Sequence, residues 1–410
     1  VLAPRALGRR GRPGWLVGAT GRIRREPIGV VLVLAPSNYP LFLPGVQILQ
    51  ALVAGNAVLA KPAPGCTEPL RLLRTWLIAA GLDPELLVVL GEDIETAEAV
   101  LDARVDKVFL TGSATTGRSV LARLAATVTP AVMELSGCDA VFVCPDADLD
   151  LVARALRFGL TLNGSRTCIA PRRVFVPRAQ QAPLEAALVR ALDALPPDPP
   201  AIPPAAGVED ALQTSLAAGA RLLWGDPASF PSTRPVVLTE VQPDMAVARE
   251  DLFAPVLSVL PVDDEEDALR QAAACPYALG ASVFGSPPVA ERLAGRVNAG
   301  LVTVNDLIVP SADPRLPFGG RGMSGFGTTR GPDGLLERTV PKAVVVRRGR
   351  SRPHLDPPRG GEADLFAAWV RMAHGPTWRQ RWQGLRELVR AGRALGKSDA
   401  GPADDRGGGE

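Results

Sequence analysis

From residue 27 onward, short apolar runs alternate with segments whose apolar residues recur at helical spacing. Residues 28–35 carry no charge and read as a strand buried on both faces, whereas the apolar positions of 44–54 recur as in a helix. This alternation is typical of an α/β fold with a doubly wound parallel sheet. The predicted strands are 28–35, 57–61, 86–90 and 107–111, and the predicted helices are 44–54, 67–80, 92–101 and 113–125.

A second α/β region follows from about residue 137. The Pro-rich stretch 196–204 is typical of a stiff linker. After residue 350 the pattern changes, and 363–395 reads as an amphipathic, Arg-rich helical segment. Such a helix can lie on a membrane, but packing on its own domain or on a subunit is the simpler interpretation. In the second region the predicted strands are 141–143, 173–176, 236–238, 258–261 and 301–304, and the first predicted helix is 149–161.

The composition is that of a globular protein and argues against several functions. Of the 410 residues, 47% are hydrophobic and 21% charged, and the net charge is +2 with scattered basic residues, so we expect no nucleic-acid partner. Residues 28–60 carry no charge, yet Pro, Asn and Gln interrupt them, so we expect no transmembrane segment. The five cysteines show no paired spacing, which predicts neither disulfides nor a metal site and favours a cytoplasmic location.

Cys168 and Glu134 are the strongest candidates for chemistry. Cys168 stands in a Gly-containing loop between a predicted helix and a predicted strand, where Arg166 and Arg172 would favour its thiolate form. Glu134 ends an apolar run, so it reads either as part of a surface turn or as a base with a raised pKa that activates water. A lone cysteine is more often an inert apolar residue, but this pair offers a nucleophile and a base for acyl transfer through a thioester.

Two further segments follow predicted strands. Asn38 lies between prolines directly after the strand 28–35, where it can form a turn or donate its amide to a developing oxyanion. Residues 111–117 join a strand to a helix, and Ser113 is a good N-cap at a helix start that favours phosphate. This motif is weak alone, and the Gly-x-Gly-x-x-Gly fingerprint follows none of the predicted strands.

Taken together, these segments resemble the aldehyde dehydrogenase superfamily over about residues 12–348. Each motif falls in the family's order, and the separation of Glu134 and Cys168 is the family's. The matching segments are Asn38-Tyr39-Pro40, Lys61-Pro62, Thr111-Gly112-Ser113 with Gly117, Glu134-Leu135-x-Gly137, Asp251-Leu252-Phe253-x-Pro255-Val256, Asn305, Pro317-Phe318-Gly319-Gly320 and Ser324-Gly325-x-Gly327.

The resemblance implies an activity and a set of site residues. Cys168 would attack an aldehyde, and the Asn38 amide and the Cys168 backbone N–H would hold the oxyanion. NAD or NADP would accept the hydride, and Glu134 would activate water to release the carboxylic acid. No metal ion is implied. The implied cofactor-binding residues are Lys61, Gly112, Ser113, Gly117, Leu135, Asp251 and Phe253.

The resemblance also implies a domain organisation. Residues 27–136 would form the dinucleotide-binding domain and 137–338 the catalytic domain. Residues 1–26 and 339–350 look like the strands of an oligomerisation arm, so we expect a homodimer or a larger assembly. Residues 351–410 would be a helical C-terminal extension with a disordered end.

Several positions depart from the family's pattern, among them Ser165-Arg166, which replaces a Gly-Gln before the Cys. Ser37 replaces a Trp beside the cofactor, Pro64 replaces a carboxylate after Lys-Pro, Ser136 replaces a Gly, and Asp251 is shorter than the family's Glu. These changes leave the choice between NAD and NADP open. They also keep two alternatives: a catalytically impaired scaffold whose dinucleotide site has decayed, and a CoA-acylating dehydrogenase, against which Glu134 argues.

Overall fold

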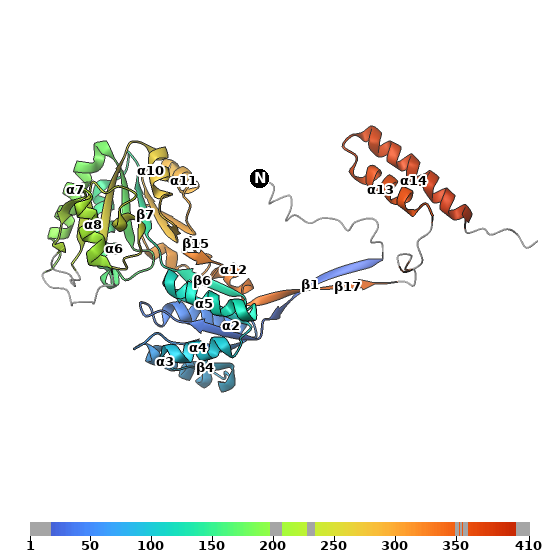
Figure 1. The fold of residues 1–410 in the computed structure, drawn as a ribbon, viewed down its shortest axis with the longest axis horizontal. Helices are drawn as coiled ribbons and strands as arrows, with labels where there is room; N and C mark the ends of the chain where they lie inside the picture. The colour runs from blue at the N-terminus through green and yellow to red at the C-terminus, as the bar shows by residue number, and fades with distance from the viewer. Residues whose placement is uncertain are drawn as a thin grey trace, which may run out of the picture. The chain divides into compact units, whose positions relative to one another are not determined.

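The structure is a computed structural model, and it describes residues 18–196, 207–227, 234–348, 352, 355 and 360–398. The chain divides into two compact units, one formed by Ile23–Lys342 and the other by Val1–Arg22 with Ala343–Glu410. Figure 1 shows the elements of each unit. Two larger sheets form the body of the unit Ile23–Lys342.

The first of these sheets has the strand order β16-β6-β5-β2-β3-β4 (Figure 1). Its long strands are parallel and buried on both faces, because Val31 and Val33 of β2 pack in one core and Leu32 and Leu34 in another. The strands are β2 (Val30–Leu34), β3 (Ala57–Lys61), β4 (Leu87–Val89), β5 (Lys107–Gly112), β6 (Ala131–Leu135) and β16 (Gly325–Phe326). The helices are α2 (Phe42–Val53), α3 (Thr67–Ala79), α4 (Ile94–Asp102) and α5 (Ala114–Thr127), with a short 3-10 turn at Pro84–Leu86.

The second sheet has the strand order β14-β13-β7-β8-β11-β10-β9, and its strands pair in parallel except for β9. The predicted α/β class with a doubly wound parallel sheet is therefore confirmed. The strands are β7 (Asp139–Val143), β8 (Pro171–Pro177), β9 (Arg221–Trp224), β10 (Val236–Thr239), β11 (Val256–Val262), β13 (Gly280–Phe284) and β14 (Leu301–Val304). The helices are α6 (Leu149–Thr161), α7 (Arg178–Asp193), α8 (Val208–Ala217), α9 (Ala246–Arg249), α10 (Glu265–Ala272) and α11 (Pro287–Ala294).

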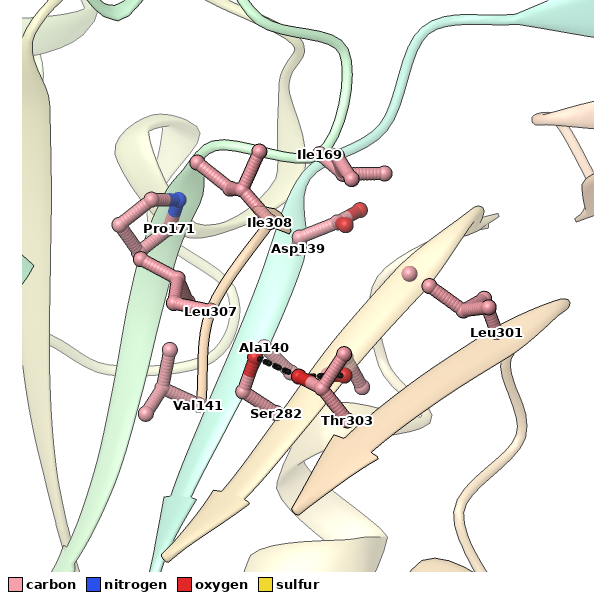
Figure 2. A pocket seen from close by; sticks show the side chains of 12 residues that line it. Asp139, Ala140, Val141, Ile169, Pro171, Ser282, Leu301, Thr303, Leu307 and Ile308 are labelled. Carbon is pink, nitrogen blue, oxygen red and sulfur yellow. Dashed lines mark hydrogen bonds between the residues drawn. The ribbon is translucent and has the colours of Figure 1, made fainter. Parts of the chain in front are cut away.

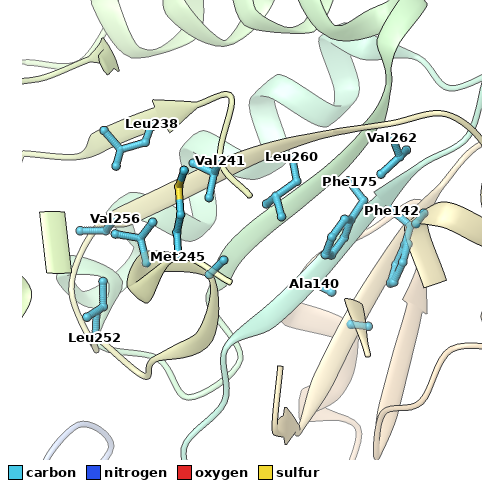
Figure 3. Packing of buried hydrophobic residues seen from close by; sticks show 14 of the residues in the cluster. Ala140, Phe142, Phe175, Leu238, Val241, Met245, Leu252, Val256, Leu260 and Val262 are labelled. Atoms are coloured by element: carbon cyan, nitrogen blue, oxygen red, sulfur yellow. The ribbon is translucent and has the colours of Figure 1, made fainter. Parts of the chain in front are cut away.

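The core of the second sheet is built on stacked aromatic rings. Phe142 of β7 and Phe175 of β8 stack with their ring centroids 5.2 Å apart, and Leu260 of β11 packs in the same cluster (Figure 3). Neighbouring parallel strands bring these side chains to one face of the sheet. This rigid core holds β8, and the loop that precedes β8 carries Cys168.

Strand β16 joins the first sheet, although the sequence placed residues 325–326 in the second domain. It pairs antiparallel with β6, so that Gly325 lies opposite Glu134. A two-residue strand has no periodicity from which to predict it. Gly325 has φ +97°, and a Cβ there would collide with the carbonyl oxygen of Met133, so only glycine permits this pairing. The carboxyl end of β6 is thereby covered by a segment from near the end of the domain.

The remaining elements lie outside the two larger sheets. Among the described residues, no helix has the length and apolar character needed to cross a membrane. The segment 363–395 is two helices broken at Gly375-Pro376, because proline removes a helix N–H. Residues 1–17, 197–206 and 399–410, which include part of the predicted arm and most of the predicted linker, lie outside the described residues. The elements are β1 (Ala19–Pro27) paired with β17 (Thr339–Arg347), β12 (Tyr277–Ala278) paired with β15 (Arg321–Gly322), α12 (Gly331–Leu336), 3-10 turns at Leu162–Ser165 and Val309–Ala312, α13 (Glu362–His374) and α14 (Trp378–Ser398).

Candidate active site

A tight turn between α6 and β8 presents Cys168. Asn163, Gly164 and Ser165 have φ of +52°, +60° and +61°, which is an uncommon conformation for the two non-glycine residues. The guanidinium of Arg172 on β8 donates to the Oγ and to the carbonyl oxygen of Ser165, each over 2.7 Å. These hydrogen bonds stabilise the turn from the rigid sheet, so the position of Cys168 is set by β8.

Glu134 faces Cys168 from the end of β6. The thiol Sγ of Cys168 donates to Oε1 of Glu134 over 3.9 Å, although 34 residues separate them. Glu134 is buried in the strand and not part of a surface turn. Burial raises the pKa of Glu134 to about 7, while the charge of Arg330 and hydrogen bonds from Thr329 and Thr111 oppose the rise. The carboxyl group is therefore poised to gain or lose a proton near neutral pH.

The expectation that Arg166 and Arg172 favour the Cys168 thiolate is wrong. Burial and the charge of Glu134 raise the pKa of the Cys168 thiol well above its usual range. Arg172 is engaged by Ser165 and by the carbonyl of Ala254 instead. The resting side chain is thus a thiol. The cation that opposes these effects is Arg330, which sequence reasoning missed because it is distant along the chain from both Cys168 and Glu134.

Asn38 lies in the loop after β2 and contacts the Cys168 loop. Its Nδ2 donates to the carbonyl oxygen of Arg166 over 3.0 Å, and the hydroxyl of the neighbouring Tyr39 is hydrogen-bonded to Thr167 Oγ1 over 2.7 Å. The two loops therefore form one structural unit. An Asn amide carries two N–H bonds, and one of them is used by Arg166.

Cys168, Glu134 and Asn38 line one cavity of about 310 Å³. It lies where β2, β5 and β6 end, and the carboxyl edge of a parallel sheet is where such folds bind ligands. Of the predicted site residues, Lys61 and Gly117 do not line the cavity. The lining residues are Pro36, Ser37, Asn38, Thr111, Gly112, Ser113, Glu134, Leu135, Ser136, Cys168, Asp251 and Phe253.

The cavity has features that fit a dinucleotide. Asp251 Oδ1 is buried, and none of the described residues donates to it, so the hydroxyl of a ribose would satisfy this oxygen. Ser113 caps α5 by accepting the N–H of Thr116 over 3.1 Å, which leaves a helix N-terminus facing the cavity. A Cβ at Gly117 would lie 2.8 Å from Cδ2 of Leu135, so glycine is required where α5 approaches β6.

A carboxylate stands near Lys61 even though Pro64 removes the expected one. Lys61 Nζ donates to the backbone carbonyl of Glu92 over 2.8 Å, and the Glu92 carboxylate accepts from Thr67 Oγ1 over 2.5 Å. Hydrogen bonds from Thr67 and the Gly65 backbone lower the pKa of Glu92, so its side chain is ionised. Sequence reasoning missed Glu92, because it follows the next strand, β4.

A second buried carboxyl group lies behind the Cys168 loop. Asp139 lines a small cavity of about 10 Å³ with Ile169 and Thr303 (Figure 2), where Thr303 is hydrogen-bonded to Ser282 over 2.8 Å. Burial raises the pKa of Asp139 well above its usual range. Among the described residues none is hydrogen-bonded to its Oδ1. The sequence pattern did not single out Asp139, since no local signal marks a carboxyl group at the start of a buried strand.

Comparison with known proteins identifies the family. The aldehyde dehydrogenase family pattern matches residues 6–344. A 4,4′-diapolycopene aldehyde oxidase of Methylomonas sp is 33% identical over 430 aligned residues, covering 94% of this chain and 80% of that protein. The structure of Mycobacterium tuberculosis aldehyde dehydrogenase with NAD+ has a TM-score of 0.75 and 30% identity, covering 82% of this chain and 74% of that chain.

A second solved structure bears on the cofactor. The NADP-dependent glyceraldehyde-3-phosphate dehydrogenase of Bacillus halodurans C-125, complexed with NADP, has a TM-score of 0.73 and 30% identity, and the match covers 80% of this chain and 71% of that chain. Structures similar to this chain therefore hold NAD or NADP. The chain belongs to the aldehyde dehydrogenase family, and it is an NAD(P)-dependent enzyme that oxidises an aldehyde to a carboxylic acid.

Proposed function

We propose that Cys168 is the nucleophile of this oxidation, Glu134 its general base and Asn38 an oxyanion donor. The observation that carries the proposal is the hydrogen bond of 3.9 Å from Cys168 Sγ to Glu134 Oε1. Both side chains line the cavity that Asn38 also lines. A nucleophile, a base within hydrogen-bond reach and a nearby amide donor are the groups that acyl transfer requires.

The attack begins from a thiol, so its proton has to leave. Glu134 accepts that proton as the Cys168 Sγ forms a bond to the carbonyl carbon of the aldehyde. The carbonyl oxygen becomes an oxyanion, which takes hydrogen bonds from the second N–H of the Asn38 amide and from the Cys168 backbone N–H. The product of this step is a thiohemiacetal on Cys168, and Glu134 then releases its proton to solvent.

The acid is released in the second half of the reaction. When bound, the nicotinamide of NAD or NADP would accept the hydride released as the C–H bond of the thiohemiacetal carbon breaks, and Cys168 would then carry the acyl group as a thioester. Glu134 takes a proton from water while the water oxygen attacks the acyl carbon. The Cys168–acyl bond breaks and the sulfur regains a proton. A base whose pKa is about 7 is well suited to this exchange at neutral pH.

Cofactor binding is assigned to the residues around the cavity and beyond β3. Asp251 would accept from a ribose hydroxyl, and the capped start of α5 at Ser113 would bind a phosphate. Lys61 and Glu92 would contact the second ribose, where an ionised carboxylate favours a hydroxyl over a phosphate. We therefore infer a preference for NAD over NADP. The remaining cofactor contacts are assigned to Gly112, Gly117, Leu135 and Phe253.

The substrate is assigned to the apolar aldehydes. The Methylomonas relative, which is similar over nearly the whole chain, carries the name of such an aldehyde. None of the described residues that line the cavity is Lys or Arg, and the nearby cation Arg330 interacts with Glu134 and Cys168, an arrangement that favours an uncharged aldehyde. Purified protein with NAD or NADP and a panel of apolar, aromatic and acidic aldehydes tests this. Efficient turnover of succinic semialdehyde but not of a polyene aldehyde would contradict the assignment.

Product analysis separates the hydrolytic reaction from the CoA-acylating alternative. Because Glu134 is placed to activate water, the acid is expected at the same rate with and without CoA. A CoA thioester as the main product would contradict Glu134's role. If neither NAD nor NADP binds at millimolar concentration, the scaffold alternative is correct. Two measurements together distinguish the three functions: a fluorescence titration of the protein with NAD or NADP, and analysis of the product formed with and without CoA.

The protein is also assigned to the cytoplasm and to a homodimer or larger assembly. All five cysteines are free thiols in the structure, which suits a reducing compartment. Strand β17 leaves Val345 and Val346 exposed by 69% and 50%, and adjacent exposed valines on a two-stranded ribbon are suited to pairing with another copy. Sedimentation velocity measures the assembly, and a single species with the monomer mass of 43.0 kDa would contradict this part of the proposal.

A further inference from the structure

The hairpin of α13 and α14 is held together by its own contacts. Ala368 of α13 and Gly384 of α14 are buried where the helices meet, and a Cβ at Gly384 would collide with the backbone nitrogen of Met372. Arg371 and Glu387 form an ion pair across the two helices. The hairpin therefore uses a narrow strip of each helix for its internal packing.

A second set of apolar side chains is left outside this packing. On α14, Trp378, Trp382 and Val389 are 72%, 50% and 46% exposed, and spacings of four and seven residues bring them to one face. These three residues of α14 are called the exposed stripe. Burying large aromatic side chains is strongly favourable, so a surface of this kind indicates a contact beyond the hairpin itself.

A row of arginines runs beside the exposed stripe on α14. Arg379, Arg386, Arg390 and Arg393 recur at spacings of seven, four and three residues, which aligns them along one side of the helix. The guanidinium of Arg386 lies 5.9 Å from the ring centroid of Trp382, so the row and the stripe are in contact. Trp378–Ser398 carries five Arg and one Lys against one Glu, a net charge of +5.

We propose that the exposed stripe and this arginine row bind the surface of an anionic lipid bilayer, with α14 lying in the plane of the interface. Indole rings are favoured at the headgroup level, and arginines beside them pair with lipid phosphates. An apolar face flanked by cations is the pattern of helices that lie on membranes. The proposal does not depend on the proposed function, because no step of aldehyde oxidation uses the hairpin.

Charge and apolar area together favour a bilayer over two other partners. A second copy of the same face would bring two helices of net charge +5 together, and like charges oppose that contact. A nucleic acid would satisfy the arginines but would leave Val389 without an apolar partner. An anionic bilayer offers both phosphate groups and an apolar interior next to them.

The test mixes the full chain with vesicles of phosphatidylcholine alone or with about 30% phosphatidylglycerol, and measures the sedimented fraction and the tryptophan emission. We expect binding to the anionic vesicles with a blue shift, and weaker binding at high salt. Two double variants test the two parts of the surface: Trp378→Ser with Trp382→Ser, and Arg386→Glu with Arg390→Glu. Each is expected to weaken partitioning of the protein onto the anionic vesicles by about tenfold or more. Circular dichroism shows whether the variants keep their helices.

Matched controls come from the other unit. Trp76 on α3 is 56% exposed, and Arg154 and Arg249 are exposed on α6 and α9. Trp76→Ser, and Arg154→Glu combined with Arg249→Glu, are expected to leave vesicle binding unchanged. The proposal is overturned if the wild-type chain does not bind anionic vesicles, or if both stripe and arginine variants bind as well as it does. If the stripe variants bind vesicles like the wild type but differ from it in the mass of the assembly in solution, the stripe makes contacts between copies of the chain instead.

Discussion

Arg172 donates to both oxygen atoms of Ser165 over 2.7 Å, and through them it holds the turn that presents Cys168. The turn has a left-handed backbone at Ser165, a conformation that persists only where the surroundings enforce it. Arg172 also donates to Ala254, close to Asp251 and Phe253 in the chain. One buried guanidinium therefore links the loop of the nucleophile to the segment assigned to the cofactor.

Replacing Arg172 is expected to lower both stability and turnover. Arg172→Met leaves the Ser165 carbonyl buried without this donor, and an unsatisfied buried acceptor costs about 1–3 kcal/mol. Unfolding by urea and steady-state turnover measure the two effects. Arg154→Met, on the exposed face of α6, is the control and is expected to change neither. Equal stability of Arg172→Met and the wild type would show that the turn at Ser165 does not depend on Arg172.

Cys168→Ala is expected to abolish aldehyde oxidation while cofactor affinity stays the same, because Sγ forms the bond to substrate and the cofactor contacts are elsewhere. Steady-state turnover measures the loss of oxidation, and a fluorescence titration with NAD measures the cofactor affinity. Cys144→Ala is a matched control, since Cys144 is also a buried thiol with a raised pKa but lies outside the cavity. Full activity in the Cys168 variant would remove Cys168 from the mechanism.

Glu134→Gln is expected to stop the reaction at the thioester. A Gln side chain cannot take a proton from water, so any acylation that still occurs gives at most one equivalent of reduced cofactor. Stopped-flow absorbance measures this burst, and mass spectrometry of the quenched protein detects the acyl group on Cys168. Glu250→Gln, which is exposed and outside the cavity, is expected to turn over normally. Steady turnover of the Glu134 variant would mean that another group activates water.

Hydrolysis of the thioester is expected to accelerate as pH rises through about 7. Burial raises the pKa of Glu134 above its ordinary value, and the base works only when deprotonated, so the rate falls by about tenfold per pH unit below that point. Arg330 holds this pKa down, so Arg330→Met is expected to move the midpoint to higher pH, while Arg330→Lys keeps it closer to the wild type. A midpoint that is the same in all three proteins would contradict the role of Arg330.

Glu92→Gln is expected to weaken the preference for NAD over NADP by about tenfold, because an ionised carboxylate near Lys61 repels a ribose phosphate. The ratio of kcat/KM for the two cofactors measures the effect. Glu95→Gln, on the exposed first turn of α4, removes the same charge a short distance away and is expected to leave the ratio unchanged. A wild-type enzyme that prefers NADP would contradict the assignment of Glu92.

The sequence alone determined the fold class and most of the parallel strands. Runs such as 57–61 and 301–304 agree with β3 and β14 residue for residue, because short, mainly apolar runs rich in β-branched residues favour strands. It also identified the loop of Cys168 between α6 and β8, since helical and extended periodicities change there. Local patterns are sufficient for these features because they depend on neighbours along the chain.

Only the tertiary structure decided the electrostatics of the site. The pKa of Glu134 depends on its burial and on Arg330, and that of Cys168 on burial and on Glu134, so adjacent arginines in the sequence were misleading. The hydrogen bond between Lys61 and Glu92 likewise joins the end of β3 to the segment after β4. Desolvation and charge interactions act through space, and folding brings these groups together without leaving a periodic trace in the chain.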